Sequence, residues 1–238
     1  MTQHIDLGKI PVDVIQKDIK NLHLSVYPPT GRVRISAPTR MKLDTIRVYA
    51  ITKLDWIKKQ QKRIREQERE TQREYVERES HWVWGRRYLL SLVADGHKPS
   101  VELAHGTMVL KVRRGASKKM KQAIVDAWYR EQVKTALPAL IAKWEPKIDV
   151  KVRKYFVRRM KTRWGSCNKR TGNIRFNTDL GRKPAQCLEY VVVHELVHLL
   201  EPSHNARFMS LMEKYMPQWK HYRDQLNRLP VQHEKWDY

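Results

Sequence analysis

Two histidines and a glutamate in the second half of the chain have types and spacing that suit a metal site. They form His194-Glu195-Leu196-Val197-His198, an HExxH pattern. Residues four apart lie on one face of a helix, so His194 and His198 can direct two imidazole nitrogens at one metal ion. Glu195 projects beside that face and can take a proton from a water molecule that the metal activates. The pattern predicts hydrolysis with Zn2+ as cofactor and Glu195 as general base.

A catalytic zinc ion takes three protein ligands and keeps one position open, so a third ligand is needed. His204 follows His198 by the offset of the third histidine in the longer pattern HExxHxxGxxH. Where that pattern has glycine, the chain has Glu201, and Pro202 follows it. Because proline cannot continue a helix, we expect the helix to end near Leu200 and the chain to turn back there.

The segment after this turn carries further candidates. Ser203 is expected to cap a second helix that begins at His204 and extends to about Tyr215. Glu213 in that helix is the alternative third metal ligand, and otherwise it would support a ligand from behind. The residues that could stabilise an oxyanion are Arg207, Tyr215 and Tyr222.

The elements that position these residues are a helix and a short pair of strands. Pro184 suits the first turn of the active helix, and apolar residues from Val192 to Leu200 give it a wide surface to bury. The sequences RWGSC and NIRFN, around Trp164 and Ile174, predict a hairpin. Either this hairpin only supports the helix, or one of its strands also holds an extended substrate at the sheet edge.

Two sequence blocks carry a resemblance to a known family. They are Thr162–Leu180 (TRWGSCNKRTGNIRFNTDL) and Tyr190–Pro217 (YVVVHELVHLLEPSHNARFMSLMEKYMP). The segment that contains them resembles the YgjP-like family of predicted zinc metallopeptidases, which are related to the WLM and SprT-like peptidases. The resemblance implies an α+β fold with a zincin-like catalytic domain, in which the active-site helix packs beside a small sheet. Met209 stands where we expect a tryptophan, a change that should affect packing beneath the site.

Carried over by position, the resemblance also implies functional residues. The zinc ligands would be His194, His198 and His204, and Glu195 would be the general base. The implied enzyme is a zinc metallopeptidase whose substrate is a protein or peptide.

The charge of the chain points to a second class of partner. Its 238 residues have a formal net charge of +23 and a pI of about 10.1, which predicts attraction to polyanions such as nucleic acid. Two cysteines are too few for a disulfide framework, and neither a signal peptide nor a long apolar run is visible. We therefore expect a cytoplasmic protein without a membrane partner.

The first part of the chain reads as a mixed module. Strands are expected in IPVDVI, LHLSVY and RVRIS as a small antiparallel sheet, with a turn at residues 28–31. One long helix is expected over residues 41–79, with a solvated polar half. Further strands are expected between His81 and Val112, where His81, His97 and His105 should be surface or loop residues.

The remaining elements belong to the expected catalytic domain. A helix is predicted over residues 117–144, kinked or split at Pro138, and a strand over residues 150–156. A last helix is predicted over residues 218–229. These patterns favour two domains, an N-terminal sheet-and-helix module over residues 1–115 and a metallopeptidase domain over residues 116–238.

Three hypotheses follow from these patterns. The leading one is a zinc-dependent metallopeptidase. The alternative is a nucleic-acid-associated basic protein, with phosphates contacted by clusters such as Arg113-Arg114 with Lys118-Lys119 and residues 151–163, or a protease recruited to DNA. In the third, the zinc ion only stabilises the fold, which would require four protein ligands.

Overall fold

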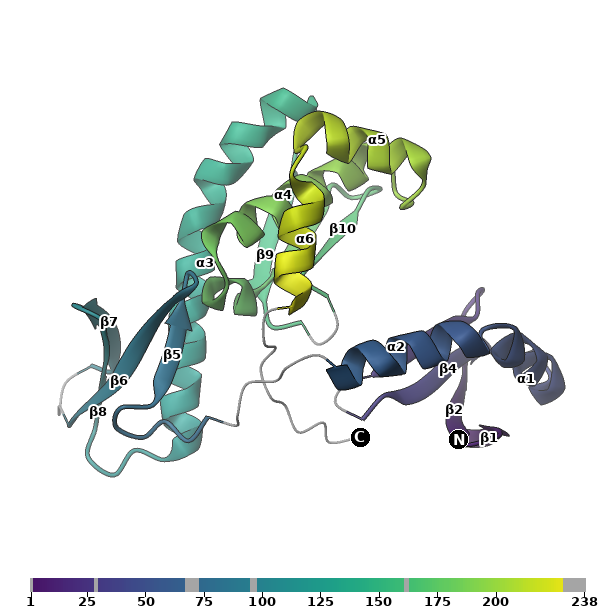
Figure 1. The fold of residues 1–238 in the computed structure, drawn as a ribbon, viewed down its shortest axis with the longest axis horizontal. Coiled ribbons are helices and arrows are strands. Elements are labelled where there is room, and N and C mark those ends of the chain that lie inside the picture. The colour runs from purple at the N-terminus through teal and green to yellow at the C-terminus, as the bar shows by residue number, and fades with distance from the viewer. Residues whose placement is uncertain (1, 28–29, 67–72, 95–97, 161–162, 229–238) are drawn as a thin grey trace. The chain divides into compact units, whose positions relative to one another are not determined.

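The computed structural model describes residues 2–27, 30–66, 73–94, 98–160 and 163–228. By internal contacts the chain forms two compact units, which divide after Gln72. Both units contain helices and strands (Figure 1), so the predicted α+β class is confirmed. No helix in the described part of the chain is both long enough and apolar enough to cross a bilayer.

The first unit is a four-stranded sheet with two helices. Its strands are β1 (Thr2–Leu7), β2 (Ile10–Lys17), β3 (His23–Tyr27) and β4 (Arg32–Pro38). Their order is β1-β2-β4-β3, with a hairpin at each edge and β2 parallel to β4 in the middle. The three predicted strands are confirmed and β1 adds a fourth. The antiparallel prediction is wrong for the central pair, because β4 returns between β2 and β3.

The single long helix predicted over residues 41–79 is wrong. The structure has two helices, α1 (Leu43–Thr52) and α2 (Leu54–Glu66), with a break at Lys53. Their buried residues Ile46, Ala50 and Ile57 pack in the core of the first sheet. Residues 73–79 are not helical, and Tyr75 is in the left-handed region with φ of 55°. Tyr75 cannot stay on a solvated helix because its ring is buried in the core of the second unit.

The second unit begins with another four-stranded sheet. Its strands are β5 (Ser80–Val83), β6 (Arg86–Ala94), β7 (Ser100–Ala104) and β8 (Thr107–Val112). The order β5-β6-β8-β7 repeats that of the first sheet, again with a parallel pair in the middle. The hairpin turns of both sheets use glycine with positive φ, at Gly8, Gly31, Gly85 and Gly106. The turn at Gly85 divides a stretch that the sequence pattern presents as one strand.

A long helix, α3 (Lys118–Ile148), connects this sheet to the rest of the unit. Ser117 caps it by accepting a hydrogen bond from the Met120 amide at 3.3 Å. The predicted split at Pro138 is wrong, since α3 continues through it and the neighbouring Leu137 is fully buried. The predicted boundary after residue 115 falls inside the second unit, because Tyr129 of α3 packs in the core of the β5–β8 sheet. The functional division into residues 1–115 and 116–238 stays a prediction.

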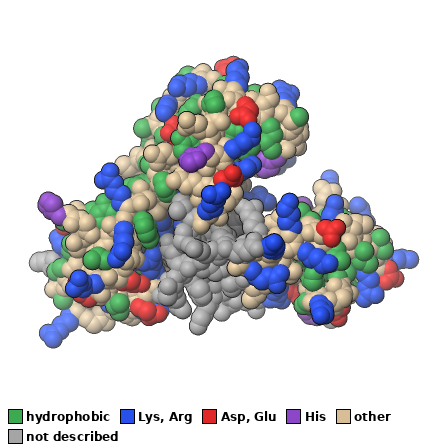
Figure 2. All heavy atoms as spheres, viewed as in Figure 1, with side chains coloured by type: hydrophobic (Ala, Val, Ile, Leu, Met, Phe, Trp, Pro, Cys, Tyr) green, Lys and Arg blue, Asp and Glu red, His purple; other side chains and the backbone are tan. Residues whose placement is uncertain are grey.

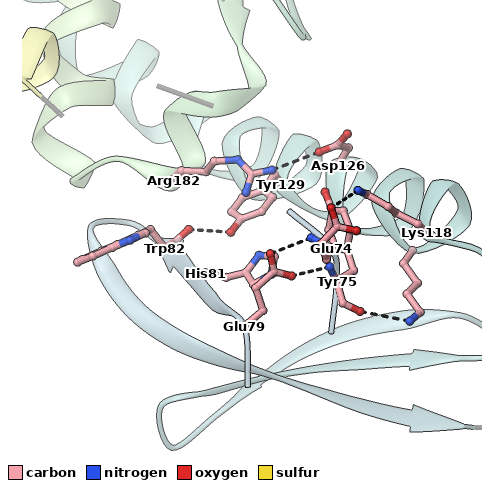
Figure 3. Close-up of polar contacts among 10 residues, drawn as sticks. Glu74, Tyr75, Glu79, His81, Trp82, Lys118, Asp126, Tyr129 and Arg182 are labelled. Atoms are coloured by element: carbon pink, nitrogen blue, oxygen red, sulfur yellow. Dashed lines mark hydrogen bonds and ion pairs between the residues drawn. The ribbon is translucent and has the colours of Figure 1, made fainter. Parts of the chain in front are cut away.

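A buried polar cluster joins this sheet to α3 (Figure 3). The Tyr129 hydroxyl donates to the Trp82 carbonyl at 2.7 Å, and the Arg182 guanidinium lies 3.9 Å from the Tyr129 ring centroid. Arg182 also donates to Asp126 at 3.2 Å. His81 is fully buried in this cluster, so its prediction as a surface residue is wrong. Of the other two histidines, His105 lies exposed in a turn as predicted, and residue 97 lies outside the described residues.

The last part of the second unit contains a three-stranded sheet and the remaining helices. These elements are β9 (Lys154–Arg158), β10 (Gly165–Asn168), β11 (Asn173–Asn177), the 3-10 helix η1 (Thr178–Arg182), α4 (Ala185–Leu200), α5 (Ala206–Tyr215) and α6 (Trp219–Arg228). The predicted hairpin is confirmed as antiparallel β10 and β11, and β9 pairs with β11 in parallel. Strand β10 is at the sheet edge and packs against α4. A large apolar core connects this sheet to α3, α4, α5 and α6.

Candidate metal centre

Helix α4 holds two of the three predicted ligands. Pro184 precedes its first turn, and the helix ends at Leu200 as predicted. The fully buried Val192, Val193 and Leu196 fix it in the core, while His194 and His198 are only partly buried. The helical spacing therefore brings both histidines to one solvent-accessible face.

The turn after α4 returns the third histidine to the same place. Glu201 is extended, with φ of −131° and ψ of 107°, as expected for a residue before proline. The prediction that Ser203 caps the next helix is wrong. Asn205 is the cap, because its side chain accepts a hydrogen bond from the Phe208 amide at 3.0 Å. His204 thus lies in the loop, one residue before the cap.

The three histidines converge on one point. The distance from Nε2 of His198 to Nε2 of His194 is 3.2 Å, and from Nε2 of His204 to each of the other two it is 3.1 Å. The group could hold a metal ion, and no fourth His, Cys, Asp or Glu among the described residues joins it. Nδ1 of His198 lies 3.0 Å from the Glu201 carbonyl oxygen. Because a carbonyl can only accept, Nδ1 carries the proton and Nε2 presents a lone pair to the centre.

One aromatic ring supports all three histidines. The Phe208 ring is fully buried, and its centroid lies 5.0 Å from His194, 4.6 Å from His198 and 4.8 Å from His204. Met209, expected to affect packing beneath the site, is 38% exposed on α5. The packing beneath the imidazoles comes from its neighbour on α5.

The histidines are neutral in this environment. Burial, followed by the proximity of His198 and His204, lowers the pKa of His194 to about 3. Burial also lowers the pKa of His198 and of His204. Three unprotonated imidazoles are the form that binds a metal ion, so the donor set fits a divalent cation such as Zn2+.

Glu195 lies buried beside the histidines. Its side chain is 4% exposed, and its Oε2 makes no hydrogen bond with the described residues. Burial raises the pKa of this carboxyl to about 8, while Arg163 acts in the opposite direction. A Cβ atom at Gly165 of β10 would come within 2.4 Å of Oε1 of Glu195. Only glycine leaves room at that position for the carboxylate.

A pocket of about 480 Å³ opens over the histidines and Glu195. Its other wall comes from Cys167 of β10 and from Arg163 and Trp164, which directly precede that strand, and Tyr190 of α4 also lines it. Burial, and then the charge of Glu195, raises the pKa of the Cys167 thiol to about 12, so this cysteine stays protonated at neutral pH.

Several candidates from the sequence do not lie at the pocket. Arg207, Tyr215 and Tyr222, the predicted oxyanion stabilisers, are not among its lining residues. Glu213, the alternative third ligand, is exposed on α5 and forms an ion pair with Lys220. Sequence reasoning missed Arg163 and Gly165 as members of the site. The RWGSC motif was the available signal, but only the packing of β10 on α4 relates it to Glu195.

Comparison with known proteins identifies a family for the chain. Residues 20–229 match the YgjP-like family, described as a metallopeptidase domain. No curated protein sequence matches the chain significantly.

Two solved structures of archaeal metallopeptidase zymogens are similar to part of the chain. The zymogen of Pyrococcus abyssi abylysin is 19% identical with a TM-score of 0.35, and the match covers 40% of this chain and 98% of that one. The zymogen of Methanocaldococcus jannaschii jannalysin is 18% identical with a TM-score of 0.32, over 40% of this chain and 92% of that one. Because the family match extends over most of its length, the chain belongs to the YgjP-like metallopeptidase family.

Proposed function

We propose that the chain is a zinc-dependent peptidase that uses Glu195 as its general base. His194, His198 and His204 would hold the ion, and the observation that supports this is the 3.1–3.2 Å convergence of their Nε2 atoms. Bound zinc supplies a Lewis acid that polarises a peptide carbonyl and lowers the pKa of water. With three protein ligands one position remains open, which favours a catalytic site over a structural one.

Glu195 moves the proton in this proposal. Its carboxylate takes a proton from the attacking water and delivers it to the leaving amine. In the metal-free protein, burial raises its pKa to about 8, so most of this carboxyl is protonated at neutral pH. Its pKa falls when a cation lies beside it, so the ionised form predominates at neutral pH in the metal-loaded protein. Arg163 is the pocket cation that we propose to stabilise the oxyanion.

Strand β10 is the proposed binding site for the peptide backbone. Strand β11, which contains Ile174, lies in the middle of the sheet and has no free edge, whereas β10 has one. Residues of β10 also line the pocket. An extended peptide can therefore add to this edge through main-chain hydrogen bonds and present one bond to Glu195. Peptides N-methylated at single positions should show a raised KM where that contact is lost.

The central experiment separates metal binding from catalysis. Purified wild type should contain one zinc ion and cleave members of a peptide library. Glu195→Gln should keep the zinc and lose activity by about 10²- to 10⁴-fold, because the proton acceptor is absent. His194→Ala should lose both metal and activity, and Glu213→Gln is the matched control that should keep both. Full activity in Glu195→Gln would refute the mechanism.

A further inference from the structure

The outward face of the β9–β11 sheet has an unusual charge pattern. Between Asp149 and Asp179 the sequence contains ten Lys or Arg residues and no Asp or Glu. The three strands of the sheet lie within this segment, and three of its ten cations, Lys154, Arg158 and Arg175, are in those strands. Lys and Arg side chains are spread widely over the face of the molecule drawn in Figure 2, but an acid-free stretch of this length marks one particular sheet.

Side-chain alternation divides this sheet into two faces. Ile174 and Phe176 of β11 are fully buried, whereas Arg175 between them is exposed. On the edge strand β9, Lys154, Phe156 and Arg158 are exposed in the same alternation. Register pairs Phe156 with Arg175, which places a phenyl ring beside a guanidinium on the outward face.

The outward residues are spaced regularly. Alternate residues on a strand recur about 6.6 Å apart, so Phe156 has a cation at about that distance on each side along β9, at Lys154 and Arg158. Phe156 is 45% exposed. None of the three cations Lys154, Arg158 and Arg175 makes a hydrogen bond or ion pair with the part of the chain that the structure describes.

A pocket borders the ring of Phe156. A pocket of about 420 Å³ at the start of β9 is lined by Phe156 and Tyr155 together with Lys151, Arg153 and Lys154. Its acidic residue, Glu145, already accepts a hydrogen bond from the Val152 amide at 2.7 Å and pairs with Lys151. The pocket therefore combines aromatic walls with cations.

We propose that this face, defined by Lys154, Phe156, Arg158 and Arg175, binds single-stranded nucleic acid. A base would stack on Phe156, and phosphates would contact the three flanking cations, which is the combination that proteins use for single strands. A membrane would be expected to need more apolar surface than one phenyl ring, and an acidic peptide has no need of a stacking platform. By contrast, in the Arg113-Arg114 and Lys118-Lys119 cluster, Lys118 is already paired with Glu74.

The test measures binding of the full-length protein to labelled 20-mers of U and dT by fluorescence anisotropy. Phe156→Ala should weaken binding by about 5- to 150-fold, because one stacked base is lost. Phe156→Tyr should bind as wild type does, whereas Phe156→Leu should bind as weakly as Phe156→Ala. The triple change Lys154→Gln, Arg158→Gln, Arg175→Gln should lower the slope of log Kd against log salt by about 2. Comparing U with dT tells whether RNA or DNA is preferred.

A matched control exists in another sheet. Trp82 is 41% exposed on β5 and pairs in register with the exposed Arg87 of β6. The double variant Trp82→Ala, Arg87→Gln removes the same kinds of groups and should leave binding unchanged. Its counterpart on the β9–β11 sheet is the double variant Phe156→Ala, Arg175→Gln, which should weaken binding. Equal losses of affinity in the two double variants would overturn the proposal. The proposal would also be overturned if Phe156→Ala left the affinity for the oligonucleotides unchanged. The same holds if Phe156→Ala weakened binding only to phosphatidylserine vesicles or only to polyglutamate.

Discussion

Gly165 shows how a single residue can control the position of Glu195, the proposed general base. Since a Cβ atom there would approach Oε1 of Glu195 to 2.4 Å, Gly165→Ala should displace the carboxylate. A displacement of about 1 Å at a reacting group costs on the order of 10²-fold in rate, which we expect in kcat/KM. Metal content should not change, because the histidines come from other elements. Glu213→Gln on α5, which does not line the pocket, is the control. An unchanged kcat/KM in Gly165→Ala would show that the contact is unimportant.

His81 should make stability depend on pH. Burial, and then Arg73 and Arg182, lowers its pKa from 6.5 to about 3. Below pH 6.5 the His81 imidazole is protonated in the unfolded chain but stays neutral in the folded chain. The free energy of unfolding therefore falls as the pH drops from 6.5 toward 3. At pH 5 the loss from this one group is about 2 kcal/mol.

Urea unfolding of metal-free wild type and His81→Asn, at pH 7.5 and pH 5, measures this effect. Between pH 7.5 and pH 5 the free energy of unfolding should fall by about 2 kcal/mol more in wild type than in the variant. Identical pH dependence in both proteins would mean that His81 titrates normally in the folded state.

At the residue scale the sequence predicted the cluster of three histidines better than it predicted the residues around them. His194, His198 and His204 lie together because helical spacing and a proline turn are local properties that a sequence displays. The contact of Gly165 with Glu195 crosses between two elements, and no local pattern encodes it. The burial of His81 likewise depends on α3 and η1, which are distant in sequence.

The turn between α4 and α5 is the element that metal binding should stabilise. Helix α4 is fixed by its apolar face, whereas His204 lies in a loop with its side chain exposed. Chelation of the metal should therefore accelerate amide hydrogen exchange in residues 201–205 and leave the middle of α4 protected. In His204→Ala the loop should exchange at the chelated rate whether metal is added or not. Equal exchange of wild-type loop amides with and without chelator would contradict this dependence.

Elements were predicted well where apolar periodicity is strong and poorly where polar residues predominate. Helix α4 ends at Leu200, as proline chemistry requires. The polar stretch after α2 reads as helix because it lacks glycine and proline, yet Tyr75 leaves the helical region to fill a core. Pro138 is the opposite case, because a proline that was expected to interrupt the helix lies inside α3. The buried packing of α3 outweighs the hydrogen bond that the proline removes.

At the scale of the whole molecule, the first unit contains a complete core. All the fully buried apolar residues of its sheet and helices lie between Ile5 and Ile57. A fragment that ends at Gln72 should therefore fold alone and unfold cooperatively in urea, as followed by circular dichroism. Ile35→Ala, which empties a fully buried position, should cost about 2–5 kcal/mol and unfold most of the fragment. A wild-type fragment without a cooperative transition would show that the unit depends on the rest of the chain.

The strand order shared by the two four-stranded sheets has a consequence for how they form. Each edge hairpin joins neighbours along the chain through a glycine turn, and hairpins close within about 1–10 μs. The two parallel strands in the middle of each sheet pair residues that are farther apart in the sequence, such as Val12 with Val33. Closing this longer loop costs more conformational entropy. We therefore expect both four-stranded sheets to assemble in the same way. The two edge hairpins form first and then dock side by side, and this docking step limits the folding rate of each sheet.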